Sequence, residues 1–139
     1  MSVVVLISGR GSNLQALLDA ELPVSAVISN VAGAPGLAIA AKRGVPGRVV
    51  PHKEFASRES FDQALAEEID RYSPSLVALA GFMRVLTPGF VQSYRHRLLN
   101  VHPSLLPAFP GLNTHERALA EGVKLHGCSV HFVTADLDH

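Results

Sequence analysis

This sequence has very little cysteine and no excess of positive or negative charge. Its 139 residues include one cysteine, Cys128, which excludes an internal disulfide and a cluster of thiolate metal ligands. Twelve basic and twelve acidic residues give a formal net charge of zero, which argues against duplex nucleic acid or an anionic membrane as the main partner. A local basic pocket is still compatible with this balance.

Long apolar runs are also absent. The N-terminal run, residues 3–7, has five residues, too few for the core of a signal peptide, and no basic leader precedes it. No apolar run approaches the roughly 20 residues that span a bilayer. We therefore expect a soluble, cytoplasmic chain. Apolar residues still make up 47% of the sequence and charged residues 17%, which predicts a folded domain with a buried core.

Apolar runs of strand length alternate with segments of helical period. Residues 3–7 are apolar without interruption, which is typical of a strand covered on both faces. In segment 57–71, Phe61, Leu65 and Ile69 fall on one face and the charges elsewhere, which predicts a helix capped by Ser57. Strands are predicted at 3–7, 24–28, 47–50, 76–80, 98–102 and 128–134, and helices from a cap at Ser12 or Asn13 through Leu18, and at 36–43, 57–71, 87–94 and 114–120.

Strand–helix–strand repetition with short connections implies right-handed crossovers. It predicts an α/β fold, a Rossmann-like, mostly parallel open sheet with helices on both faces. The sequence contains no internal repeat, low-complexity stretch or linker, so residues 1–139 are expected to form a single domain.

A glycine-rich turn, SGRGSNL at residues 8–14, joins the first predicted strand to the first helix. Glycine lets the backbone approach a ligand, and a helix N-terminus offers unpaired N–H groups to an anion. A dinucleotide fingerprint would need a third glycine where Leu14 stands, and a nucleoside triphosphate loop would need Gly-Lys-Ser/Thr, which is absent. The turn suits a single phosphate. The alternative is an ordinary strand-to-helix turn with a capped helix.

Asn100 and His102 stand two residues apart at the end of a predicted strand, before a proline-rich loop. Alternate residues of a strand share a face, so the amide and the imidazole are expected to project together. If this strand is parallel to 3–7, they share the carboxyl edge with the glycine turn, where open α/β sheets bind ligands. An amide that stabilises an oxyanion and an imidazole that exchanges a proton suit acyl or one-carbon transfer to an amine. The alternative is a histidine that closes the strand end by a structural hydrogen bond.

Other side chains give weaker signals. His126 and His131 lie five residues apart, and no set of His, Asp or Glu has the spacing of a zinc site, so no metal is expected. The sequence has no Gly-x-Ser-x-Gly elbow, and Cys128 is interpreted as a small packed residue rather than a nucleophile.

Several motifs occur together in a characteristic order: VVLISGRGSNLQALLDA, VISN, LAGFMRVLTPGFV, LLNVHPSLLPAFPGLNTHERAL and HGCSVHFVTADLD. In this order they resemble the phosphoribosylglycinamide formyltransferases, a family of folate-dependent one-carbon transferases of purine synthesis. The resemblance covers essentially the whole chain. The block Asn-x-His-Pro-Ser-Leu-Leu-Pro is shared with other enzymes that use formyl-tetrahydrofolate, and the Gly-Ser-Asn-Leu turn singles out the purine enzymes among them.

The resemblance implies a role for each matching position. The catalytic positions are Asn100, His102 and Asp138; the phosphate-binding positions are Gly11, Ser12 and Asn13; the folate-binding positions are Arg58, Met83, Arg84, Val85, Leu86 and again Asn100. The implied reaction transfers the formyl group of the co-substrate 10-formyltetrahydrofolate to the amine of 5-phosphoribosylglycinamide. Both partners are small molecules, and the reaction needs no metal.

Chains of this family normally continue beyond the acidic motif through further strands and a C-terminal helix. The resemblance therefore implies a domain truncated at His139, with Asp138 poorly held and an exposed edge on strand 128–134. We expect such a chain to bind folate weakly and to turn over slowly. A partner or a second copy, as in a homodimer, could replace the missing elements.

Two alternative functions stay open. One is another formyl-tetrahydrofolate enzyme, acting on methionyl-tRNA, a nucleotide sugar or water; the neutral net charge counts against tRNA, and the phosphate turn counts against simple deformylation. The other is a catalytically impaired fragment that binds folate and phosphate. The intact pair of Asn100 and His102 argues against this fragment, and the missing C-terminal elements argue for it.

Overall fold

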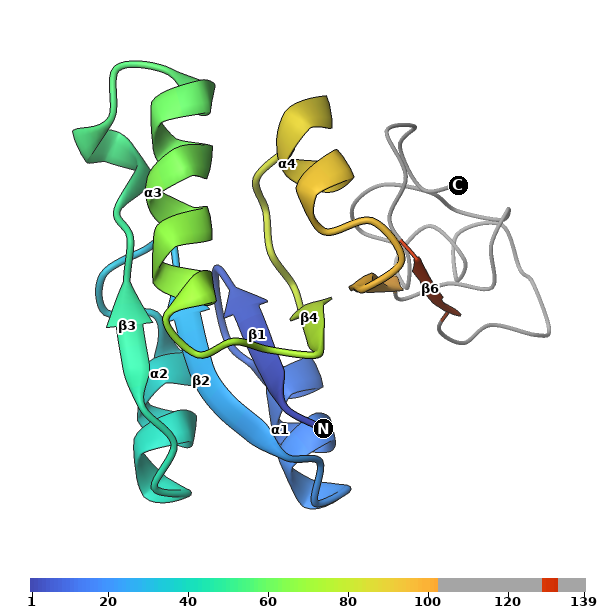
Figure 1. Cartoon of the computed structure of the whole chain (residues 1–139). Helices are drawn as coiled ribbons and strands as arrows, with labels where there is room; N and C mark the ends of the chain where they lie inside the picture. The colour runs from blue at the N-terminus through green and yellow to red at the C-terminus, as the bar shows by residue number, and fades with distance from the viewer. Residues whose placement is uncertain (103–128, 133–139) are drawn as a thin grey trace, which may run out of the picture.

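The computed structural model describes residues 1–102 and 129–132, and in this part of the chain the strands form one sheet (Figure 1). The strands are β1 (Val3–Ile7), β2 (Val24–Ser29), β3 (Gly47–Val49), β4 (Leu76–Leu79), β5 (Leu98–His102) and β6 (Ser129–Phe132). Their order is β3-β2-β1-β4-β5-β6, and all neighbours are parallel except β5 and β6. The predicted α/β fold with a mostly parallel sheet is confirmed.

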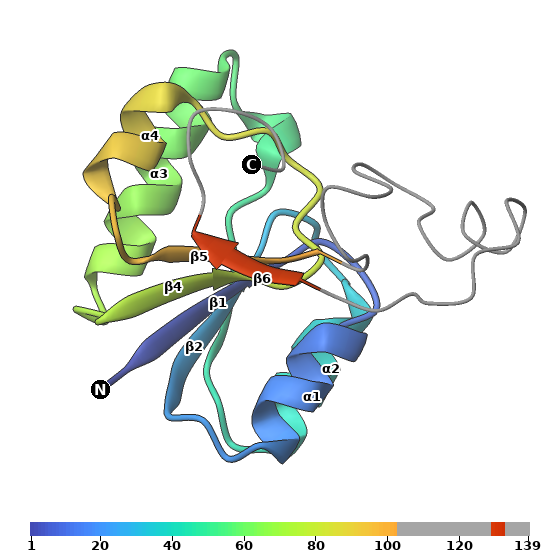
Figure 2. The same cartoon turned by 90° about the vertical axis from the view of Figure 1, so that its right-hand side faces the viewer.

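Helices cover both faces of this sheet (Figure 2). On one face lie α1 (Ser12–Asp19) and α2 (Pro35–Lys42), and on the other lie α3 (Arg58–Asp70) and α4 (Pro88–Ser93). A short 3-10 helix, η1 (His52–Glu54), follows β3. None of the helices in the described part of the chain is long and apolar enough to cross a membrane. The helix predicted at 114–120 lies outside the described residues.

The central strand β1 separates two apolar clusters. All five of its side chains are buried, and they alternate between the clusters because successive residues of a strand face opposite sides. The cluster under α3 and α4 includes Val4, Leu6, Phe61, Leu65, Ile69 and Tyr94; the cluster under α1 and α2 includes Val3, Val5, Ile7, Leu14, Leu18 and Ala40. Burial on both faces explains why the β1 segment contains no polar residue.

Helix α3 begins where the sequence predicts and is joined to α4 by a buried carboxylate. The Ser57 side chain accepts a hydrogen bond from the Ser60 N–H at 3.1 Å, so the predicted cap is confirmed. The prediction that the charges of this segment lie away from the core is wrong at Asp62, which is 4% exposed. Its Oδ2 accepts from the Thr87 N–H at 2.8 Å and from the Thr87 hydroxyl at 2.7 Å, and Thr87 is itself the N-cap of α4.

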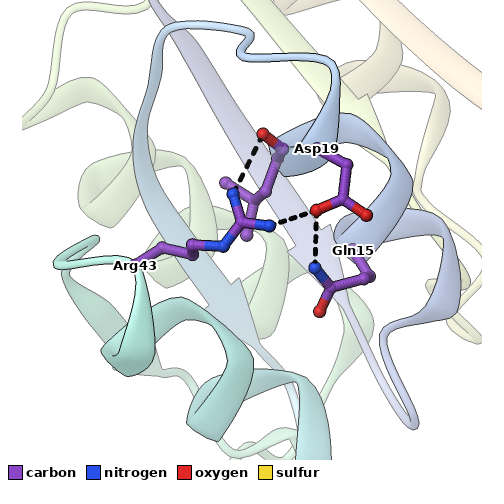
Figure 3. A network of polar contacts seen from close by, with 4 residues as sticks. Gln15, Asp19 and Arg43 are labelled. Atoms are coloured by element: carbon purple, nitrogen blue, oxygen red, sulfur yellow. Dashed lines mark hydrogen bonds and ion pairs between the residues drawn. The ribbon is translucent and has the colours of Figure 1, made fainter.

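An exposed polar network joins the last turn of α1 to the end of α2 (Figure 3). Arg43 donates to the backbone oxygen of Leu18 at 3.2 Å and forms an ion pair with Asp19, to which Gln15 also donates at 2.9 Å. The hydrogen bond from Gln15, followed by that from Arg43, lowers the pKa of Asp19 below its ordinary value. Because these groups face solvent, the network orients α1 against α2 more than it stabilises the fold.

Candidate functional site

The sheet has a topological switch point between β1 and β4. The chain leaves β1 toward β2 on one side, and after β3 it crosses to β4 on the other side. Open α/β sheets bind ligands at the carboxyl ends of the strands at such a point. A cleft of about 310 Å³ lies there, lined by Ser8, Gly9, Arg10, Gly11, Ser12, Asn13, Ala80, Gly81 and Met83.

The glycine turn forms one wall of this cleft and differs from the prediction in one respect. The N-cap of α1 is Gly11, with a left-handed backbone (φ 83°), and no side chain caps the helix. The prediction that Ser12 or Asn13 caps the helix is therefore wrong, because both already belong to its first turn. A Cβ atom on Gly11 would lie 2.8 Å from the Cα of Gly36 in α2. Close packing of two backbones, rather than a ligand, makes glycine necessary at position 11.

The first turn of α1 leaves donors available to a ligand. The first backbone hydrogen bond of the helix runs from the Gln15 N–H to the Gly11 oxygen at 2.8 Å. The N–H groups of Ser12 and Asn13 come before it and therefore take no part in the hydrogen bonds within the helix. Both residues line the cleft, and the exposed Arg10 lines it beside them. Free N–H groups, the positive end of the helix dipole and a guanidinium together can hold an anion.

The opposite wall comes from the loop after β4, residues 81–87. Met83 and Val85 are 63% and 59% exposed, while Arg84 and Leu86 are half-buried. The guanidinium of Arg84 lies 5.7 Å from the ring centre of Phe61 in α3. The four residues of this loop that the resemblance assigned to folate binding thus alternate between solvent and the α3 side of the sheet, and Met83 itself lines the cleft.

Two side chains hold this loop from outside. The Met83 N–H donates to the Ser8 hydroxyl at 2.8 Å, and Asp62 accepts both donors of Thr87 at the far end of the loop. The sequence analysis included Ser8 and Arg10 in the glycine turn without giving either residue a role, and it did not identify Asp62. The local signals for Ser8, its place in the glycine turn and directly after a buried strand, do not reveal a contact 75 residues away.

Asn100 lies at the same edge of the sheet as the cleft. It pairs in register with Leu79 of β4, and Leu79 pairs with Leu6 of β1. Two strand spacings therefore separate Asn100 from β1, roughly 10 Å. Asn100 is half-buried and is not among the residues that line the cleft. His102 is the last residue of β5, two positions further on, and pairs in register with Ser129 of β6.

The other predicted positions do not line the cleft or lie outside the described residues. Arg58 is the exposed first residue of α3 and does not line the cleft. Asp138 and Cys128 lie outside the described part of the chain. Among residues 1–102 and 129–132, no group of three His, Cys, Asp or Glu side chains could hold a metal ion.

The chain is similar to proteins of known activity. The family described as "Formyl transferase" matches residues 1–139. The phosphoribosylglycinamide formyltransferase of Escherichia coli (strain K12) is 54% identical over 99% of this chain and 68% of its own length. The human trifunctional purine biosynthetic protein adenosine-3 is 49% identical over 98% of this chain, which spans 14% of that protein.

Solved structures give the same result. The phosphoribosylglycinamide formyltransferase of Coxiella burnetii superposes with a TM-score of 0.94 at 52% identity, covering 100% of this chain and 68% of that one. The glycinamide ribonucleotide transformylase 1 of Symbiobacterium toebii superposes with a TM-score of 0.92 at 46% identity, covering 99% of this chain and 68% of that one. The chain belongs to the formyl transferase family.

Proposed function

We propose that this protein transfers the formyl group of 10-formyltetrahydrofolate to the amine of 5-phosphoribosylglycinamide, a reaction of purine synthesis. One observation carries the proposal beyond the similarity to relatives. The N-terminus of α1, which follows β1, and the end of β5, which bears Asn100 and His102, lie at the same edge of the sheet, on either side of β4. The substrate carries its phosphate at one end of a ribose and its amine on the glycinamide group attached at the other end, and the separation of roughly 10 Å between turn and strand suits that length.

The phosphate is assigned to the glycine turn. The first-turn N–H groups of Ser12 and Asn13 and the backbone at Gly11 face the cleft, and they donate to phosphate oxygens without any change of backbone conformation. Arg10 adds a positive charge on the same wall. The absence of a lysine from this turn fits one phosphate rather than a di- or triphosphate.

The folate is assigned to loop 81–87 and the start of α3. Exposed apolar side chains at Met83 and Val85 offer contact area to an aromatic ring, and the backbone between them offers hydrogen bonds to its polar edge. Arg58 presents an exposed guanidinium, the group that pairs best with the carboxylates of a folate tail.

In the proposed reaction the substrate amine attacks the formyl carbon, and the carbonyl oxygen becomes an oxyanion. The amide N–H of Asn100 donates to that oxygen and stabilises the tetrahedral intermediate. Collapse of the intermediate breaks the bond between the formyl carbon and N10 of the folate. In this reaction His102, which we pair with Asp138, takes the proton that the amine loses and delivers it to N10 of the folate. Atoms and charge balance without a metal.

The test is a direct assay of the purified protein with both substrates. We expect tetrahydrofolate and formylated ribonucleotide to form in equal amounts, with no release of free formate. Formyl transfer to methionyl-tRNA, or formate release without ribonucleotide, would overturn the proposal in favour of another activity. Folate binding without any product would identify a binding module instead.

Two variants test the assigned chemistry. Asn100→Ala removes the oxyanion donor and is expected to lower kcat by about 10²–10³-fold while the circular dichroism spectrum stays unchanged. His102→Ala is expected to lose comparable activity. Ser93→Ala is the control and should keep wild-type turnover, because Ser93 is an exposed position in α4 whose hydroxyl donates to the Gly89 oxygen of the same helix. Wild-type turnover in either active-site variant would contradict the assignment.

A further inference from the structure

Ser8 stands between the two walls of the cleft and contacts both sides through one hydroxyl. Its Oγ accepts the Met83 N–H at 2.8 Å, and its O–H donates to the side-chain oxygen of Asn30 at the end of β2. Ser8 belongs to the glycine turn and Met83 to the loop after β4, so one side chain joins the two segments to which the substrates are assigned.

The Ser8 hydroxyl is fixed in direction by buried neighbours. Asn30 is 3% exposed, and its backbone N–H donates to the Ile7 oxygen at 3.4 Å. His52 Nδ1 lies 3.0 Å from both the side-chain Nδ2 and the backbone oxygen of Asn30, so it bonds to Asn30 in either tautomer. With the hydroxyl proton directed toward Asn30, a lone pair of Ser8 Oγ remains aimed at Met83.

The backbone of the loop depends on this hydrogen bond because it makes few others. No other hydrogen bond links the backbone of residues 81–86 to the described part of the chain; the next anchor is Thr87 on Asp62. Phe82 and Leu86 pack against the apolar cluster under α3 and α4, but Met83 is 63% exposed, so its backbone is held by the bond to Ser8 rather than by packing of its own side chain.

We propose that Ser8 is a positioning residue for the folate-binding loop. Its hydroxyl fixes the backbone at Met83 relative to the glycine turn, and so sets where the folate ring lies relative to the bound ribonucleotide. This role rests on the proposed function, since it assumes that residues 83–86 bind folate. Ser8 itself need not touch either substrate.

Steady-state kinetics of Ser8→Ala test this role, because the KM values for the two substrates are expected to respond differently. Losing one neutral hydrogen bond is expected to raise KM for 10-formyltetrahydrofolate about three- to tenfold. KM for the ribonucleotide should change less than twofold, because the packing of Gly11 on Gly36 holds the turn independently. Ser8→Thr keeps the hydroxyl and should restore the folate KM. Ser2→Ala, at the opposite end of β1, is the matched control and should behave as wild type.

Hydrogen exchange supplies a readout that needs no ligand. In Ser8→Ala the Met83 amide is expected to exchange about tenfold faster than in the wild type, and Ser8→Thr should return it to the wild-type rate. Unchanged exchange, or equal increases of KM for both substrates, would overturn the positioning role while leaving the formyl transfer intact. A wild-type protein that neither binds folate nor transfers formyl groups would refute the proposed function first, and the positioning role with it.

Discussion

At the scale of single residues, Gly11 carries two constraints at once. Its backbone is left-handed, and a Cβ atom there would stand 2.8 Å from the Cα of Gly36, a backbone atom that cannot rotate away. We expect Gly11→Ala to lower the free energy of unfolding by about 2 kcal/mol or more, since a strained non-glycine backbone alone costs roughly 1–3 kcal/mol. Urea denaturation measures the loss, and binding of the ribonucleotide should weaken in parallel.

Gly9 provides the matched control for this change. A Cβ atom on Gly9 would meet no heavy atom within 4 Å, so Gly9→Ala should leave the free energy of unfolding within about 0.5 kcal/mol of wild type. Equal destabilisation by the two substitutions would show that the packing of Gly11 on Gly36 is not the cause.

The sequence reveals the glycine turn but not the reason for each glycine. The motif at 8–14 predicts a ligand site, and its residues line the cleft, yet Gly11 is required by a residue of α2 that is 25 positions away in the sequence. The roles of Ser8 and Asn30 were missed for the same reason: their value lies in contacts between segments distant in sequence, and no local spacing encodes them. The prediction that Asn100 and His102 lie in one strand is confirmed, because the two-residue period of a strand is a local pattern; their catalytic role stays a prediction.

At the scale of elements, local signals predicted helix starts well where side chains cap them. Ser57 and Thr87 both accept hydrogen bonds from the N–H three residues on, and both were predicted to open helices. The prediction failed at α1, where glycine replaces the cap. The three-residue helix η1 was also missed, because so short a segment has no period to detect.

Asp62 links two elements and should be sensitive to substitution. Its carboxylate is buried and accepts two hydrogen bonds from Thr87, which positions the start of α4 on α3. We expect Asp62→Ala to cost about 2–3 kcal/mol of unfolding free energy, because hydrogen bonds to a charged group are strong and two donors lose their partner. Urea denaturation measures it. Glu67→Ala, an exposed position on the same helix, should cost less than about 0.5 kcal/mol.

Tyr94 joins the same two helices and makes stability depend on alkaline pH. Its hydroxyl donates to Asp70 at 2.8 Å, and burial, followed by this hydrogen bond, raises the pKa of the phenol well above its ordinary value near 10. The folded state therefore holds this proton more tightly than the unfolded state. The stabilisation is fully present below pH 10 and is lost progressively as the pH rises above it.

Denaturation at pH 8 and at pH 11 measures this dependence. The wild type is expected to lose stability between these values, and Tyr94→Phe should lose distinctly less, since it has no phenol to ionise. The chain has one other tyrosine, Tyr72, whose oxygen accepts from Arg48. Tyr72→Phe is the control and should retain the wild-type alkaline loss; an identical pH response in both variants would contradict the role of Tyr94.

At the scale of the whole molecule, the topology follows from a few physical rules. Uninterrupted apolar runs correctly predicted the buried parallel strands. The handedness of the crossovers correctly predicted helices on both faces of the sheet. The antiparallel direction of β6 could not be predicted, because the segment between β5 and β6 has no pattern that fixes a reversal. The switch point between β1 and β4 depends on strand order, which no single segment encodes.

The balanced charge of the molecule makes a last prediction about salt. With a net charge of zero the molecule has no overall positive charge to attract an anion, so we expect attraction of the ribonucleotide phosphate to depend on Arg10 beside the α1 N-terminus. Screening shortens from about 10 Å at 0.1 M to about 3 Å at 1 M salt. We expect the ribonucleotide KM of the wild type to rise over this range.

Arg10→Gln should raise the ribonucleotide KM about three- to tenfold at low salt and flatten its salt dependence, since a single charge-assisted contact is lost. Arg95→Gln removes the same charge from an exposed position before β5, at the opposite edge of the sheet, and should leave both KM and its salt dependence unchanged. Equal effects of the two substitutions would mean that overall charge, not the guanidinium at the cleft, attracts the phosphate. The measurement is the steady-state KM for the ribonucleotide at several salt concentrations. The two variants have the same net charge, so a difference between them can come only from the position of the charge that is removed.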